Sequence, residues 1–147
     1  MKIEILVLSQ PVVKAIRKEV WQVVKEWETV IKIGKDVMKI IVKPGFRYDG
    51  ASIPRIAWSL IGVHPGGIAL APALSHDILY IAEGGKKKVK KVSIVSKNCS
   101  RKVADRIIYK AFLKVGVKKR RAVFMYMAVR MGGKKYWGTK KQIPVSK

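Results

Sequence analysis

The sequence predicts an α+β fold in which a small N-terminal antiparallel β-sheet or set of hairpins precedes a group of helices. Two observations carry this prediction. Apolar residues alternate over residues 1–45, which are rich in Val, Ile and Trp, whereas the spacing becomes helical after Pro54. A chain of 147 residues, of which 49% are hydrophobic, is long enough to bury a core of its own. We therefore expect one domain, with mainly β structure in 1–45, mainly helices in 54–133 and a basic tail in 134–147.

The N-terminal part contains segments typical of strands. Three of them combine β-branched and aromatic residues, at 21–27, 29–33 and 37–42. Gly34, Lys35 and Asp36 form the expected turn between the last two, and residues 3–8 are expected to join the same sheet. Pro44 and Gly45 end the sheet, and Gly50 follows closely. Residues 46–53 are therefore predicted to be a sharply turning loop.

The rest of the chain shows helical spacing interrupted by glycines. A short helix is predicted over 54–63, with Pro54 near its first turn. The sequence His-Pro-Gly-Gly at 64–67 breaks it, and a longer helix follows over 68–82, ending before two glycines. The Lys-rich stretch 86–97 is expected to be a loop, with room for a short hairpin.

Two more helices are predicted near the C-terminus. Asn98 or Ser100 can cap a helix that runs through Val115, whose apolar residues share one face. A last helix is expected over 118–131, before a pair of glycines. The basic tail that follows is expected to be loosely held.

Positive charge dominates the composition. The chain has 32 Lys and Arg against 9 Asp and Glu, for a formal net charge of +23. Basic residues are concentrated in 84–121, where Asp105 is the single acid. Such a surface attracts polyanions in general, so an anionic phospholipid surface, nucleic acid and a plain solvated face all remain open. Within it Lys86, Lys87 and Lys88 are candidates to bind phosphate.

Cysteine content and hydropathy limit the cellular compartments in which the protein is expected. Cys99 is the lone cysteine, so an intrachain disulfide is excluded and a reducing cytosol or a virus particle fits. The first nine residues contain too short an apolar run, with an acid inside it, to read as a signal peptide. No segment of the sequence reaches the length of a membrane-spanning helix. We expect a soluble protein.

The predicted helix over 68–82 carries the residues best suited to chemistry. His76 and Tyr80 are four residues apart and share a face, and Asp77 projects about 100° away. A histidine can take a proton from water at neutral pH, and an adjacent carboxylate can bind a hard cation. Asp105, on the next helix, can accept a hydrogen bond from the second ring nitrogen of His76 and fix its tautomer.

A loop aspartate extends this set toward a metal site. Asp49 can add a carboxylate ligand, together with backbone carbonyls near Gly50 and Ala51. Calcium is favoured over zinc, because oxygen ligands predominate and the nitrogen or sulfur set that zinc prefers is missing.

Each candidate also has a structural explanation. His76 can be a core histidine, Asp77 an exposed helix residue and Asp49 a turn former. Asp105 can simply pair with Arg101, Arg106 or Arg130. Arg55 and Arg130 can clamp a phosphate or join a buried ion network. Because Ser52 lies in no Gly-x-Ser-x-Gly motif, a serine hydrolase is not expected.

Several short motifs resemble a known family. They are Val-Lys-Pro-Gly-Phe at 42–46, Tyr-Asp-Gly-Ala-Ser-Ile-Pro-Arg at 48–55, His-Asp-Ile-Leu-Tyr at 76–80, Ala-Asp at 104–105 and Ala-Val-Arg at 128–130. Over roughly residues 37–138 this set is similar to a family of short uncharacterised proteins encoded mainly by bacteriophages and prophages. More distantly, the order of motifs resembles the secreted bacterial phospholipase A2 enzymes.

The phospholipase resemblance implies a core of three to four helices and a role for each residue. His76 would be the general base for water, Asp105 would orient it, and Tyr80 would support the pair. Asp49 and Asp77 would bind calcium with backbone oxygens at Gly50 and Ala51. The departures are the missing disulfides and signal peptide and the N-terminal sheet region.

The resulting expectation is a phage-type, calcium-dependent, phospholipase A2-like lipid esterase that acts on the host membrane, located in the virion or the host cytoplasm. One alternative is a non-enzymatic virion or tail-associated protein that keeps a degenerate phospholipase-like core and contacts phage structural proteins. Another is a nucleic-acid-binding protein that uses the basic region 84–121.

Overall fold

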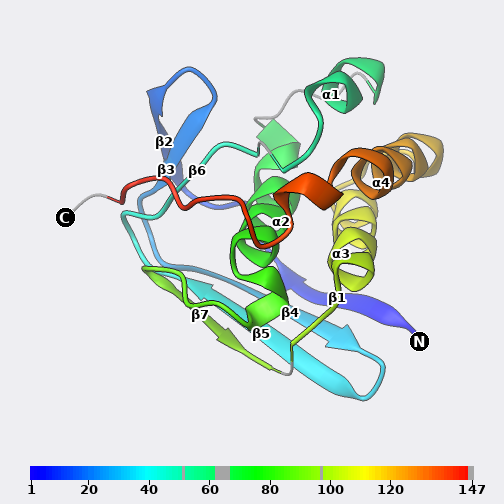
Figure 1. The fold of residues 1–147 in the computed structure, drawn as a ribbon, viewed down its shortest axis with the longest axis horizontal. Helices are drawn as coiled ribbons and strands as arrows, with labels where there is room; N and C mark the ends of the chain where they lie inside the picture. Colours follow the sequence, from blue (N-terminus) through cyan, green and yellow to red (C-terminus); the bar gives the residue numbers. More distant parts are fainter. Residues whose placement is uncertain (51, 62–66, 97, 146–147) are drawn as a thin grey trace.

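The computed structural model describes residues 1–50, 52–61, 67–96 and 98–145, and it confirms the α+β class. The main helices are α1 (Arg55–Ile61), α2 (Leu70–Ile81), α3 (Arg101–Lys114) and α4 (Lys119–Gly132). In Figure 1, α2 and α3 lie over a four-stranded sheet, α1 and α4 lie beyond them, and a smaller sheet stands to one side. Helix α2 is therefore in the interior of the molecule.

The larger sheet is antiparallel throughout. Its strands occur in the order β1 (Ile3–Leu8), β4 (Trp27–Ile33), β5 (Asp36–Val42) and β7 (Val92–Val95). The expected turn connects β4 to β5, whose register pairs Ile33 with Asp36. Alternate residues such as Ile31 and Ile40 are fully buried under the helices, as strand periodicity requires.

The smaller sheet contains the main differences from the sequence prediction. Its strands are β2 (Val13–Arg17), β3 (Val20–Val23) and β6 (Arg47–Tyr48), in that order. The predicted strand over 21–27 is wrong as one element, because β3 ends at Val23 and β4 begins at Trp27 in the other sheet. Strand β2 was missed because it is only partly buried or exposed and lacks a clear apolar alternation. Strand β7 forms within the expected 86–97 loop.

The helices agree closely with the predicted ranges. Helix α2 is preceded by a 3₁₀ turn, η1 (Gly67–Ala69), so helical structure begins close to the predicted residue 68. Ser100, rather than Asn98, caps α3, because its hydroxyl oxygen accepts a hydrogen bond from the Val103 amide. The predicted break at 64–67 falls mostly outside the described residues. No helix in the described ranges has the length and apolar character to cross a membrane.

The C-terminal segment, which we define as residues 134–145, is not loosely held as expected. After a short 3₁₀ turn, η3 (Lys134–Tyr136), the Gly138 amide donates to the Tyr80 carbonyl at 2.9 Å. The Gln142 side chain bonds both backbone groups of Lys90. In Figure 1 this segment, drawn in red, crosses α2 and continues toward the strands. It therefore covers the helix that carries the candidate site.

Gly84 provides a test of the contact between the end of α2 and the start of α3. Its φ is +74°, and an added Cβ would lie 1.9 Å from the Cys99 carbonyl oxygen. Gly67 has a similar φ of +60° with open space around it. Gly84→Ala should therefore destabilise the fold by roughly 2–5 kcal/mol, from backbone strain plus overlap. Gly67→Ala should cost only about 1–2 kcal/mol, from strain alone. Urea unfolding of both variants measures the difference, and equal losses would show that the overlap relaxes freely.

Candidate functional site

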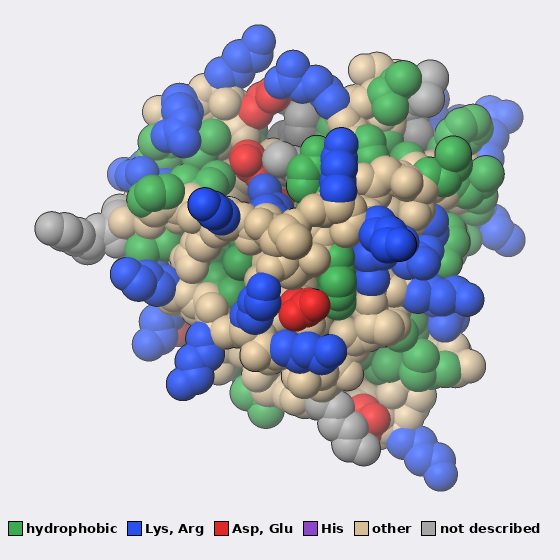
Figure 2. All heavy atoms as spheres, in the orientation of Figure 1, with side chains coloured by type: hydrophobic (Ala, Val, Ile, Leu, Met, Phe, Trp, Pro, Cys, Tyr) green, Lys and Arg blue, Asp and Glu red, His purple; other side chains and the backbone are tan. Residues whose placement is uncertain are grey.

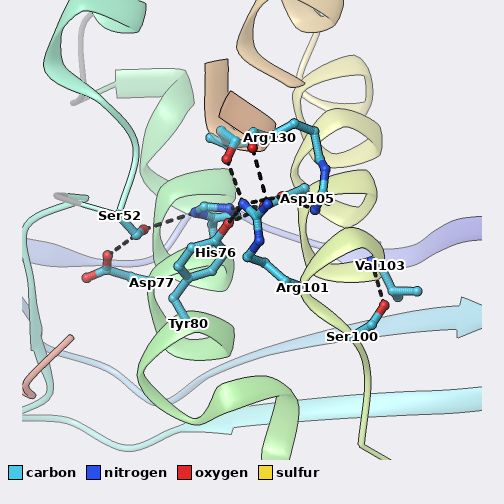
Figure 3. Close-up of polar contacts among 10 residues, drawn as sticks. Ser52, His76, Asp77, Tyr80, Ser100, Arg101, Val103, Asp105 and Arg130 are labelled. Atoms are coloured by element: carbon cyan, nitrogen blue, oxygen red, sulfur yellow. Dashed lines mark hydrogen bonds and ion pairs between the residues drawn. The ribbon is translucent and has the colours of Figure 1, made fainter. Parts of the chain in front are cut away.

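The candidate site is built around the middle of α2, where polar side chains are buried. His76 and Asp77 are both 0% exposed, and so is Asp105 on α3. Helix α2 is buried along nearly its whole length, so each of these groups must find a partner inside the protein. Figure 3 shows these side chains joined in one chain of polar contacts.

Asp105 accepts more hydrogen bonds than any other side chain in this series of polar contacts. Its Oδ1 accepts from His76 Nε2 at 2.9 Å and from the Tyr80 hydroxyl at 2.6 Å. Its Oδ2 accepts from Arg130 Nη1 at 2.8 Å and from Arg101 Nη1 at 3.4 Å. Burial acts to raise the pKa of Asp105, but the hydrogen bonds from His76, Tyr80 and Arg130 outweigh it and lower the pKa below its ordinary value. Asp105 is thus held ionised.

Arg101 ties this carboxylate to the end of α4. Its guanidinium donates to the Val129 carbonyl at 3.0 Å and to the Arg130 carbonyl at 3.2 Å. A cation bonded to the last carbonyls of a helix is favoured by the helix dipole. Because residue 133 is a glycine, the backbone after α4 can pass close to Tyr80; an added Cβ would lie 2.6 Å from the Tyr80 hydroxyl oxygen. Asp105 therefore links α2, α3 and α4.

The other nitrogen of His76 faces the loop that precedes α1. His76 Nδ1 lies 3.0 Å from the Ser52 hydroxyl oxygen, which is itself 2.9 Å from Asp77 Oδ1. Ser52 is fully buried. Figure 3 shows the serine between the histidine and the aspartate. The site thus runs from Asp77 through Ser52 and His76 to Asp105.

The hydrogen bonds from Asp77 through Ser52 to His76 require one proton that His76 and Asp77 share. Because Asp105 is ionised, His76 must donate to it from Nε2. The single hydroxyl hydrogen of Ser52 can serve only one neighbour, so either His76 Nδ1 or Asp77 must also carry a hydrogen. Ser52 can make both hydrogen bonds in either of two states. In one, a protonated His76 faces an ionised Asp77; in the other, a neutral His76 faces a protonated Asp77. Ser52 is placed to pass this proton between the two groups.

Asp77 also belongs to a second cluster, with Asp49 and Lys140. Lys140 Nζ lies 2.8 Å from Asp49 Oδ1 and 3.7 Å from Asp77 Oδ1. Burial raises the pKa of Asp77, and the Lys140 ammonium opposes this only in part. Burial acts to lower the pKa of Lys140, but the two carboxylates outweigh it and raise the pKa. Asp77 Oδ2 has no hydrogen-bond partner among the described residues.

The expected calcium ligands are therefore close to one another, but a lysine contacts both carboxylates. Among the side chains that the structure describes, no three of His, Cys, Asp or Glu form a group able to hold a metal ion. Gly50 has a φ of +69°, which suits the sharp turn of the loop, whereas Ala51 lies outside the described residues. This donor set does not fit calcium while Lys140 is in place, and calcium stays an untested prediction.

The structure brings some of the candidate anion-binding residues to the site and leaves others apart. Arg130 is bonded to Asp105, as the ion-network alternative expected. Arg55 is exposed on α1 and pairs with Glu19 in the turn between β2 and β3. Residues 86–88 are exposed beyond the end of α2, where Lys87 donates to the Gly138 carbonyl.

Sequence reasoning missed two members of the site. Ser52 was set aside because it lacks a nucleophile motif, yet its place three residues after Asp49 in a Gly-containing loop was a usable signal. Lys140 gave no signal, since it is one of many lysines and lies far along the chain from Asp49 and Asp77. Only tertiary structure identifies it.

The chain belongs to a family described as "Protein of unknown function (DUF1353)", whose model matches residues 21–129. The match includes Ser52, His76, Asp77 and Asp105, and it ends before Lys140. No curated protein and no solved structure matches the chain.

The contacts of Asp105 predict a large and pH-dependent loss of stability in Asp105→Asn. Removing the charge leaves two arginines facing a neutral buried group, which should cost about 3–5 kcal/mol at neutral pH. Because the folded pKa of Asp105 is lowered, its contribution is present above the ordinary value of 3.8 and is lost as the pH falls through the folded pKa. The difference between wild type and variant should therefore shrink in acid.

Chemical unfolding at a series of pH values measures this difference. Glu28→Gln is the matched control, because Glu28 forms an exposed ion pair with Lys39 and its loss should cost about 0–1 kcal/mol. A loss in Asp105→Asn that stays constant from neutral pH down to acid would contradict the assignment.

Proposed function

We propose that this member of the DUF1353 family is a carboxylic ester hydrolase of phospholipase A2 type that acts on membrane lipid. The observation that carries the proposal is the hydrogen bond from His76 Nε2 to Asp105, with His76 Nδ1 turned toward a hydroxyl oxygen. A base held by a buried carboxylate on one nitrogen, with its other nitrogen directed at an oxygen at hydrogen-bond distance, is the arrangement that can activate water for acyl transfer.

Each residue then has a role in the proposed reaction. Asp105 holds the His76 ring in the tautomer whose Nδ1 can accept a proton, and Tyr80 supports Asp105 through its 2.6 Å hydrogen bond. In the proposed step His76 takes a proton from the attacking water, whose oxygen forms a bond to the ester carbonyl carbon. Collapse of the tetrahedral intermediate breaks the ester bond, and the proton passes to the leaving alcohol.

Access to His76 requires the C-terminal segment to move in this proposal. The ring is completely buried, and Trp137 packs edge-on against Tyr80 with ring centroids 5.1 Å apart. Water would enter beside the Ser52 hydroxyl, which lies at hydrogen-bond distance from Nδ1 in the closed state. Opening at a membrane surface would couple hydrolysis to lipid binding.

A lipid surface as substrate is supported by the outer face of α1 and α4, which pack together. This apolar patch consists of exposed large hydrophobic residues: Ile56, Val123, Phe124, Met127 and Met131. Figure 2 shows hydrophobic side chains gathering at the upper right, over α1 and α4, with Lys and Arg around them. Apolar side chains surrounded by cations suit an anionic bilayer, where both insertion and charge attraction contribute. The proposed setting, attack on the host envelope by a phage protein, rests on the motif resemblance.

A second candidate is a non-enzymatic virion or tail-associated protein in which the same residues form a structural polar cluster. The complete burial of His76, Asp77 and Asp105 favours it, because a purely structural network needs no access to substrate. This candidate predicts that the protein is a stoichiometric component of purified particles and releases no fatty acid from lipid.

The base assignment predicts that His76→Gln lowers fatty-acid release from phosphatidylglycerol vesicles by about 10²–10⁴-fold. Ser52→Gly is the informative control, because deleting the hydroxymethyl group makes room for water beside Nδ1 and should keep activity. Unfolding measurements on both variants separate loss of chemistry from loss of fold. Loss of activity in a folded Ser52→Gly protein would point to a serine nucleophile, and no release by wild type would refute the hydrolase.

The apolar patch predicts a separate effect on membrane binding. Phe124→Ser with Met127→Ser should weaken sedimentation with phosphatidylglycerol vesicles by about tenfold, because two exposed apolar side chains no longer insert. Hydrolysis of a short-chain ester in solution should be unchanged, since neither residue contacts the site. Val95→Ser, at an exposed position on the edge strand β7, is the control at a different surface. Unchanged vesicle binding would remove this face from the proposal.

A further inference from the structure

We propose that Lys140 supplies the cation of this site, taking the place in which the phospholipase resemblance puts calcium. The inference rests on the proposed function only in that both concern the same residues. Lys140 Nζ contacts Asp49 Oδ1 at 2.8 Å and Asp77 Oδ1 at 3.7 Å, and the lysine side chain is only 9% exposed. The two carboxylates named as calcium ligands thus already face a cation from the same chain.

The burial of Lys140 shows that this contact is specific. A lysine is the side chain least often buried, and it stays charged in the interior only when paired. The chain has 32 Lys and Arg, yet this one is placed against two of only nine acids. Contacts on either side fix it: the Gly138 amide donates to the Tyr80 carbonyl, and the Gln142 side chain bonds the backbone of Lys90. The C-terminal segment therefore holds the Lys140 ammonium in a defined position beside Asp49 and Asp77.

Charge balance also favours an ammonium over a divalent ion. In the part of the network that the structure describes, three carboxylates (Asp49, Asp77 and Asp105) face three cations (Arg101, Arg130 and Lys140). Calcium in place of Lys140 would add a further positive charge to a largely buried cluster whose carboxylates and cations already match in number, which its surroundings oppose.

Lys140 acts here as a positioning residue. By holding Asp77 it fixes the partner of Ser52, and through Ser52 it fixes the side chain that faces His76 Nδ1. It also fastens the C-terminal segment over α2. The site is consequently expected to be assembled without metal.

Calcium binding tests the inference without any ester substrate. Calcium chloride is titrated calorimetrically into the full-length wild-type protein and into Lys140→Met, which keeps the side-chain length but removes the charge. Wild type should give no binding heat and the same melting temperature in calcium and in chelator. Lys140→Met should bind calcium at least about tenfold more tightly, because the competing charge is gone. The double variant Lys140→Met with Asp49→Asn should lose that gain.

Several outcomes would overturn the inference. Stoichiometric calcium binding by wild type, with a raised melting temperature, would show that the metal displaces Lys140. Equal lack of binding in Lys140→Met would show that the pair of carboxylates is no cation site. If Lys140→Met does not fold alone, calcium should restore folding, and failure to do so counts against the proposal. Lys140→Arg should behave as wild type. Because none of these readouts uses lipid, they remain decisive even if the protein hydrolyses no ester.

Discussion

The structure depends on keeping one carboxylate ionised in the interior. Asp105 accepts hydrogen bonds from a histidine and a tyrosine on α2, from Arg101 on its own helix and from Arg130 on α4. An ion pair of this kind contributes little net stability compared with apolar packing, but removing one partner leaves uncompensated charge in the core. Its value lies in specifying how three helices meet. The close approach at Gly133 and the position of the Tyr80 hydroxyl both follow from that meeting.

The predictable part of the molecule is the part governed by local periodicity. Apolar spacing predicted α2, α3 and α4 within a few residues, and Asn98 and Ser100 were the two predicted caps of α3, of which the structure uses Ser100. The split of the predicted strand 21–27 between two sheets could not be predicted, because the residues that separate β3 from β4 lack a glycine or proline. Strand β2 is exposed and leaves no apolar pattern to detect.

The candidate site shows the same division. His76, Tyr80 and Asp105 could be grouped from the sequence because helix geometry puts the first two on one face and α3 follows next in the chain. Lys140 could not, because its partners lie on a loop and a helix far away in sequence, and an ion pair across that separation has no sequence periodicity. The tail was expected to be loose because it is basic and lies at the end of the chain. Its packing rests on Trp137, Gly138, Lys140 and Gln142, each an ordinary residue for an exposed tail.

The distribution of acids connects the interior to the surface. With nine acids among 147 residues, placing Asp49, Asp77 and Asp105 in one network leaves few carboxylates to offset the exposed lysines. The interior is balanced by Arg101, Arg130 and Lys140, whereas the outer surface keeps a large excess of positive charge. Exposed positive charges of this kind attract polyanions in general, and they belong to other residues than the ion pairs of the network. Long-range attraction to a partner and assembly of the buried network are thus carried by different sets of residues, and substitutions can separate them.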